Sequence, residues 1–78
     1  MNYSYEDFVS DLHIGREIEF KYRGKIYATL NVKEGFGIGE HHKVFDYFQT
    51  VDEMLNKRKI NGQKLIDIWS EVEVIAIF

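Results

Sequence analysis

The most conspicuous polar cluster in this sequence is Glu40-His41-His42, two adjacent histidines beside a carboxylate. Imidazole and carboxylate groups bind metal ions and exchange protons, so a small metal-binding protein or enzyme using this cluster is one hypothesis. Neighbouring residues of a strand point to opposite faces, however, and the sequence has no His-x-x-x-His pair of the kind that binds zinc from a helix. We therefore expect a solvated junction between a loop and a strand, with no metal, no cofactor and no catalytic residue.

Three glycines alternate with two large apolar residues just before this cluster, in Gly35-Phe36-Gly37-Ile38-Gly39. A phosphate-binding loop would need a helix directly after its glycines, usually with a Lys and a Ser or Thr, and strand-like residues follow instead. We predict a flexible hairpin tip over residues 33–39. Apolar side chains on such a tip can dock on a partner, so the predicted partner-binding residues are Phe36, Ile38, His41 and His42.

The single basic patch, Lys57-Arg58-Lys59 with Lys64, would be the site of a weak nucleic-acid binder. Cations at the end of a helix also complement its dipole, which is a sufficient reason for them. The net charge of −3 and the pI near 5.5 argue against nucleic acid or an anionic membrane as the main partner. The absence of cysteine excludes thiolate zinc sites and thiol catalysis.

The 78 residues predict one domain, 1–78, and the 45% hydrophobic and 15% aromatic content provides the material for a core. The N-terminus lacks a basic and an apolar region, so no secretory signal is expected. The longest apolar run, Val74 to Phe78, is too short to cross a bilayer. These features predict a cytoplasmic protein, which could equally be a phage protein in a host cytoplasm.

The elements that must position these residues follow from periodicity. Residues 4–13 predict a helix capped by Ser4, and residues 16–22 alternate as a half-buried strand. A second strand runs from about residue 25 to 32 after the Arg23-Gly24 turn. A two-residue loop there would pair Phe20 with Tyr27, whereas a three-residue loop would pair it with Ile26, and the sequence leaves both registers open.

The second half predicts a third strand within residues 40–48 and a helix opened by a capping box at Thr50 and Glu53. A further helix is predicted from Asn61 through Trp69 to Val72. The apolar run 72–78 predicts a strand paired inside the sheet, because such a strand left exposed invites aggregation. The predicted fold is α+β in the order α-β-β-β-α-α-β, a small antiparallel or mixed sheet of about four strands with helices on one face.

Two patterns, REIEFKYRGKIY from Arg16 to Tyr27 and INGQKLIDIW from Ile60 to Trp69, resemble small uncharacterised proteins of Gram-positive bacteria. Those proteins share a charged first strand, a Gly-Lys turn and an I-x-G-x-x-L-x-x-I-W segment. The resemblance implies packing and turn roles for these residues and brings no activity, cofactor or catalytic residue.

The leading functional hypothesis is a small regulatory or protein–protein interaction module without catalysis. Its partner would be another protein or a second copy of itself, since aromatic residues are abundant and strand edges are available for pairing. The metal-binding protein or enzyme and the weak nucleic-acid binder are the alternatives.

Overall fold

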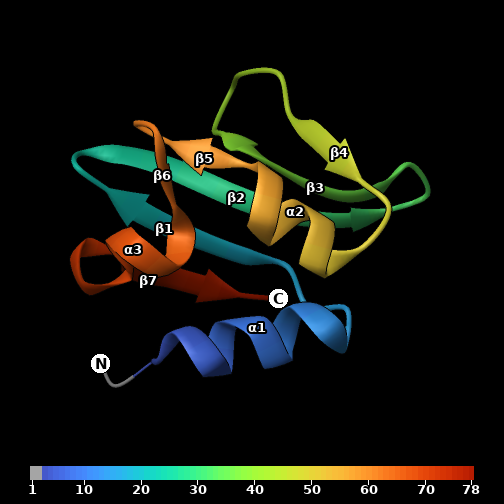
Figure 1. Ribbon diagram of the computed structural model, residues 1–78, viewed down its shortest axis with the longest axis horizontal. Helices are drawn as coiled ribbons and strands as arrows, with labels where there is room; N and C mark the ends of the chain where they lie inside the picture. Colours follow the sequence, from blue (N-terminus) through green and yellow to red (C-terminus); the bar gives the residue numbers. More distant parts are fainter. Residues whose placement is uncertain (1–2) are drawn as a thin grey trace.

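The computed structural model describes residues 3–78, and in them three α-helices pack on one face of a five-stranded antiparallel sheet (Figure 1). The strand order is β4-β3-β2-β1-β7, and β5 and β6 form a separate small hairpin. The predicted α+β class with helices on one face is confirmed. The elements are α1 (Tyr5–His13), β1 (Ile18–Tyr22), β2 (Lys25–Val32), β3 (Gly35–Glu40), β4 (Asp46–Phe48), α2 (Val51–Lys57), β5 (Lys59–Ile60), β6 (Gln63–Lys64), α3 (Leu65–Ile68), the 3-10 helix η1 (Trp69–Glu71) and β7 (Glu73–Ile77).

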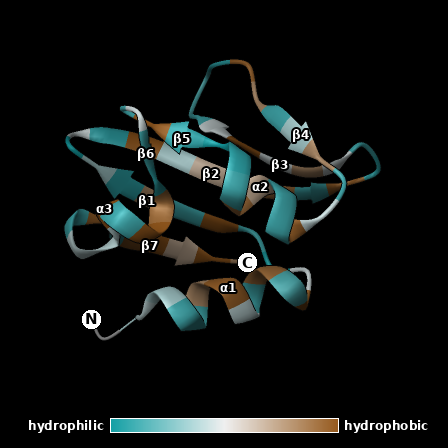
Figure 2. Cartoon of the chain, viewed as in Figure 1, coloured by the Kyte–Doolittle hydropathy of each residue, from teal (hydrophilic) through white to brown (hydrophobic). Residues whose placement is uncertain are grey.

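Helix α1 begins as its sequence predicts. The Ser4 hydroxyl accepts a hydrogen bond from the Asp7 amide at 3.0 Å, and the Asp7 carboxylate accepts one from the Ser4 amide at 3.2 Å. Phe8 and Leu12 form its buried stripe, which shows as brown segments of the helix in Figure 2. This stripe packs on the covered face of the sheet.

The turn between β1 and β2 resolves the register of the first hairpin. Arg23 and Gly24 have φ angles of 48° and 79°, the left-handed pair that a two-residue type I′ turn requires. Phe20 therefore lies opposite Tyr27, and both side chains are buried beneath the helices. Because side chains alternate along a strand, the same register places Ile26, Ala28 and Leu30 on the open face.

The predicted hairpin tip at residues 33–39 is wrong. Only Lys33 and Glu34 form the turn, and Gly35 to Glu40 pair with β2 as strand β3. Phe36 and Ile38 point to the helices while Gly37 and Gly39 face the other side, which is the alternation of a strand. The strand predicted within residues 40–48 is the short strand β4, Asp46–Phe48; it is the fourth strand of the chain, and residues 41–45 connect it to β3.

The helix predicted from Asn61 is also wrong over its first half. Asn61 and Gly62 have φ angles of 52° and 76°, so they turn the hairpin of β5 and β6 where a helix cap was expected. Helix α3 and the 3-10 helix η1 form the second half of the predicted helix. Leu65 and Ile68 are buried as their spacing predicts.

Strand β7 pairs only with β1, so it forms an edge of the sheet, contrary to the expectation of a strand paired on both sides. A bulge between Glu19 and Phe20 interrupts the ladder. Bulges increase the local twist of an edge strand, which is one way for proteins to discourage pairing with another chain.

An aromatic cluster joins α1, β1 and η1 at the centre of the core. The Phe8 ring lies 4.5 Å from the Trp69 ring and 6.2 Å from the Phe20 ring, measured between centroids. The Trp69 indole donates to the Tyr3 carbonyl at 3.1 Å. Aromatic rings and aliphatic side chains together fill the space between the helices and the covered face of the sheet.

Candidate binding surface on the open face of the sheet

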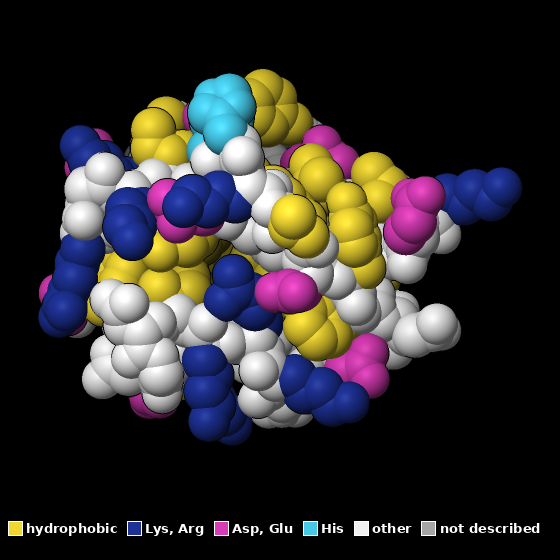
Figure 3. All heavy atoms as spheres, turned by 90° about the horizontal axis from the view of Figure 1, so that it is seen from above, with side chains coloured by type: hydrophobic (Ala, Val, Ile, Leu, Met, Phe, Trp, Pro, Cys, Tyr) yellow, Lys and Arg dark blue, Asp and Glu magenta, His cyan; other side chains and the backbone are white. Residues whose placement is uncertain are grey.

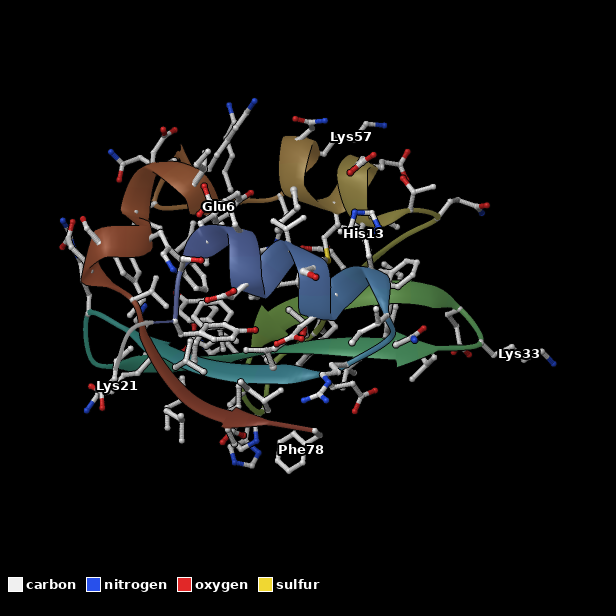
Figure 4. The ribbon with its side chains drawn as sticks, turned by 90° about the horizontal axis from the view of Figure 1, so that it is seen from below. Glu6, His13, Lys21, Lys33, Lys57 and Phe78 are labelled. Carbon is white, nitrogen blue, oxygen red and sulfur yellow. The ribbon has the colours of Figure 1, made fainter. Side chains whose placement is uncertain are left out.

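The face of the sheet opposite the helices carries no helix within residues 3–78. In Figure 4 the helices lie above the sheet with Glu6, His13 and Lys57, while Phe78 projects below it. Apolar side chains on this open face stay accessible, including Ile26 at 37% and Val32 at 39% exposure. An exposed apolar sheet face of this kind is a feature of binding surfaces.

Small residues form a shallow valley across the middle of the open face. The strand registers place Ala76, Glu19, Ala28 and Gly39 side by side on β7, β1, β2 and β3. Three interstrand spacings make this row roughly 14 Å long. Glu19 carries the only long side chain in the row, so the valley is low, with a carboxylate near one end.

The glycines of β3 allow aromatic rings to fold over the far end of this valley. A Cβ atom built on Gly39 would lie 2.8 Å from the Phe45 ring, and one built on Gly37 would lie 2.7 Å from the Tyr47 ring. Both distances are shorter than side chains tolerate, so the two rings rest directly on the glycine backbone. Phe45 from the connection between β3 and β4, and Tyr47 from β4, thereby form an aromatic wall.

An open pocket of about 200 Å³ lies in the valley, between this wall and Phe78 beside β7. Phe78 is 74% exposed. The floor is apolar, and two carboxylate residues lie on it, Glu17 just before β1 and Glu19 within β1. The lining residues are Glu17, Ile18, Glu19, Ala28, Thr29, Leu30, His41, Phe45 and Phe78.

The charge of the pocket is one-sided. None of the described residues that line it is Lys or Arg, and neither Glu17 nor Glu19 forms an ion pair with another described residue. Glu17 uses one carboxylate oxygen to accept a hydrogen bond from the Asn31 amide at 2.9 Å. Lys21, two residues after Glu19 on the same face of β1, is the nearest cation along the strand. Two carboxylates therefore face an apolar, aromatic hollow.

The structure separates the four predicted partner-binding residues. Phe36 is half-buried on the covered side and Ile38 is fully buried in the core, so neither lies on an exposed tip. His41 and His42 are exposed, and His41 lines the pocket. In Figure 3 histidine side chains, in cyan, project at the top edge of the molecule with yellow hydrophobic groups on either side.

Strand alternation also divides the Glu40-His41-His42 cluster. Glu40 lies opposite Tyr27 on the covered side, where burial and the Glu40 charge both raise the pKa of the Tyr27 hydroxyl. The rings of His41 and His42 lie 4.3 Å apart, and His42 has a φ of 67° in the turn that follows β3. Within residues 3–78 no three His, Cys, Asp or Glu side chains gather as a metal site would require.

The basic residues at the end of α2 are already engaged. Lys57 pairs with Glu53 at 3.1 Å, and Arg58 pairs with Asp46 of β4 at 3.0 Å. Lys59 and Lys64, the other two cations of the patch, form no ion pair with another described residue. Two unpaired lysines in a chain of net charge −3 make a weak electrostatic site for a polyanion.

Sequence reasoning missed Glu19, Ala28, Phe45 and Phe78 as parts of a site. Two signals in the chain could have indicated Glu19 and Ala28. The two-residue loop register places Ala28 beside Glu19, and the alternation of Gly-Phe-Gly-Ile-Gly leaves one strand face without side chains. Phe45 could not be found in this way, because its position depends on where the next connection folds.

No helix among residues 3–78 has the length and apolarity to span a membrane. Comparison of the chain with family models, with curated proteins and with solved structures gives no match, so the functional assignment rests on the geometry of the open face.

Proposed function

We propose that this chain is a small protein-binding module without catalysis, and that it holds its partner on the open face of the sheet. The observation that carries the proposal is the valley with an aromatic group at each end, Phe45 and Phe78, on a face that no described helix covers. Ligand pockets for drug-sized molecules and cofactors measure roughly 300–1,000 Å³. The pocket here, at about 200 Å³, suits one side chain of a protein partner better than a cofactor.

The sheet provides a rigid platform for such a partner. Glu19 and Ala28 lie on the two central strands β1 and β2, which are each paired on both sides. A site on paired strands is held more firmly than a site on a loop, so less ordering entropy is lost on binding.

The test is selection of peptides from a random phage-displayed library on three immobilised proteins. Ala28→Arg fills the valley, and Asn56→Arg on the exposed side of α2 adds the same side chain far from it. We expect peptides to be enriched on the wild type and on Asn56→Arg but not on Ala28→Arg, with all three proteins showing cooperative thermal unfolding. Enrichment of the same peptides on Ala28→Arg, or on none of the proteins, would overturn the proposal.

A further inference from the structure

We infer that the pocket on the open face accepts an arginine side chain from a segment of the partner protein. This inference rests on the proposed function and adds the chemistry of recognition to it. It follows from three features of the pocket: its size, its uncompensated carboxylates and its aromatic walls.

The size of the pocket limits what can enter. About 200 Å³ is enough for one long side chain, and the floor of Ala28 and Leu30 suits the methylene stem of that side chain. A purely apolar occupant would fit the floor but would remove water from Glu17 and Glu19 without replacing their hydrogen bonds.

The carboxylates favour a cationic occupant. The Glu19 carboxylate has no hydrogen-bond or ion-pair partner among the described residues, and the Glu17 carboxylate has one oxygen free after its bond to the Asn31 amide. A guanidinium group offers several N–H donors in one plane and can bond two carboxylate oxygens at once. An ammonium group supplies the same charge without that planar geometry.

The aromatic walls favour the same choice. Phe45 and Phe78 both line the pocket, and His41 lines it as well. A planar guanidinium stacks on aromatic faces, whereas a lysine ammonium is a compact and strongly hydrated charge. Arginine is also among the residues that most often dominate binding at protein interfaces.

The experiment measures amide chemical shifts of the full chain in ¹H–¹⁵N spectra during titration with N-acetyl-arginine methylamide. The matched probes are the citrulline analogue, which keeps the shape without the charge, and the lysine and norleucine analogues. A cation over an aromatic ring with a charge-assisted hydrogen bond is worth roughly 2- to 30-fold in affinity. We expect the shifts to map to Glu19, Ala28, Leu30 and His41, and the citrulline analogue to bind about tenfold more weakly.

Two variants localise the effect. Glu19→Gln should weaken arginine binding by about 3- to 10-fold, and Phe45→Leu by a similar factor. Glu6→Gln makes the same charge change on α1, on the other side of the sheet, and should leave the affinity unchanged. Glu19→Gln exposes no apolar surface, so its spectrum is expected to remain that of the folded protein.

Equal binding of the arginine and citrulline probes, equal effects of Glu19→Gln and Glu6→Gln, or no shift with the arginine probe would overturn the inference. The peptide selection separates this failure from that of the proposed function. Peptides that are enriched on the wild type but not on Ala28→Arg, and that lack arginine, would support the binding module and contradict only the arginine pocket.

Discussion

Gly39 shapes the candidate site because it has no side chain. Its backbone supports the Phe45 ring on the open face, and a Cβ atom there would lie 2.8 Å from the ring and 3.0 Å from the Phe45 Cα. The first contact can relax if the ring turns away, but the second involves backbone and requires the connection after β3 to move. A single methyl group at this position should therefore displace the aromatic wall.

Gly39→Ala is expected to destabilise the protein by about 1–3 kcal/mol, the usual cost of overpacking. Equilibrium urea unfolding measures this cost, and ¹H–¹⁵N spectra should show the changes concentrated at residues 41–48. Phe45→Ala removes the ring, so Gly39→Ala should cost less in that background. An equal cost of Gly39→Ala with and without the Phe45 ring would show that the ring does not rest on the glycine.

Tyr47 of β4 is placed in the same way, because its ring lies directly over the backbone of Gly37. Two glycines on one face of a strand would ordinarily weaken it, because glycine loses more backbone entropy on folding. Here each glycine position is occupied by a ring from the following segment, so the missing side chains are replaced from the neighbouring strand and its connection.

Among the elements, α2 has an N-terminus that differs in one detail from its predicted capping box. The Thr50 hydroxyl accepts from the Glu53 amide at 3.0 Å, as predicted. The Glu53 carboxylate, however, accepts from the Gln49 amide and also contacts Lys57. Glu53 thus links the end of β4 to the start of the helix and to its last turn.

The contribution of the Glu53 carboxylate should be visible in how the stability of the protein depends on pH. The Gln49 amide and then Lys57 lower the pKa of Glu53 from its ordinary value of 4.5. A carboxylate whose pKa is lower in the folded protein than in the unfolded chain stabilises the fold. This stabilisation is complete at pH values above the unfolded-state pKa, and it is lost as the pH falls through the folded-state pKa. We expect Glu53→Gln to lower the melting temperature above pH 5, and the difference from wild type to shrink below pH 4.5.

Glu34→Gln in the turn between β2 and β3 makes the same change of charge away from any helix end, and serves as the control. Its melting temperature should follow that of the wild type through the acid range. A Glu53→Gln protein that keeps the same difference from wild type at all pH values would contradict the assigned role of the carboxylate.

At the scale of the whole molecule, the aromatic cluster ties the first helix to the segment before the last strand. Phe8 is fully buried between Phe20 of β1 and Trp69 of η1, and the Trp69 indole N–H donates a hydrogen bond to the Tyr3 carbonyl. A domain of this size is stable by about 4–12 kcal/mol, and no disulfide supplements its core. Loss of one central ring should therefore remove a large part of the free energy of unfolding.

Phe8→Ala should cost about 3–5 kcal/mol, through lost burial and a cavity beside Trp69. Urea unfolding followed by tryptophan fluorescence measures it, with a midpoint shifted strongly to lower denaturant. Ser10→Ala, on the exposed side of the same helix, should be neutral or slightly stabilising because alanine favours helix. A Phe8→Ala cost below about 1 kcal/mol would show that the cluster does not hold α1 to the sheet.

The parts of the fold that were predictable from sequence are those specified by neighbours in the chain. The Ser4 cap, the stripe of Phe8 and Leu12, and the alternation of β1 each depend on interactions within a few residues, and all are confirmed. Residues 35–39 and 61–64 were misread for the same local reason. Their glycines signal turns and flexibility, whereas pairing with β2 and the type I′ turn at Asn61 decide their structure.

The α+β class and the presence of aromatic residues in the core follow from the chain alone, because periodicity and capping are local properties. The exposed histidine pair at residues 41 and 42 was also evident. Which strand face stays open, and the folding of Phe45 over Gly39, depend instead on how distant segments pack against one another. The carboxylates and rings of the pocket come from three separate segments, and only the pairing of distant strands brings such residues together.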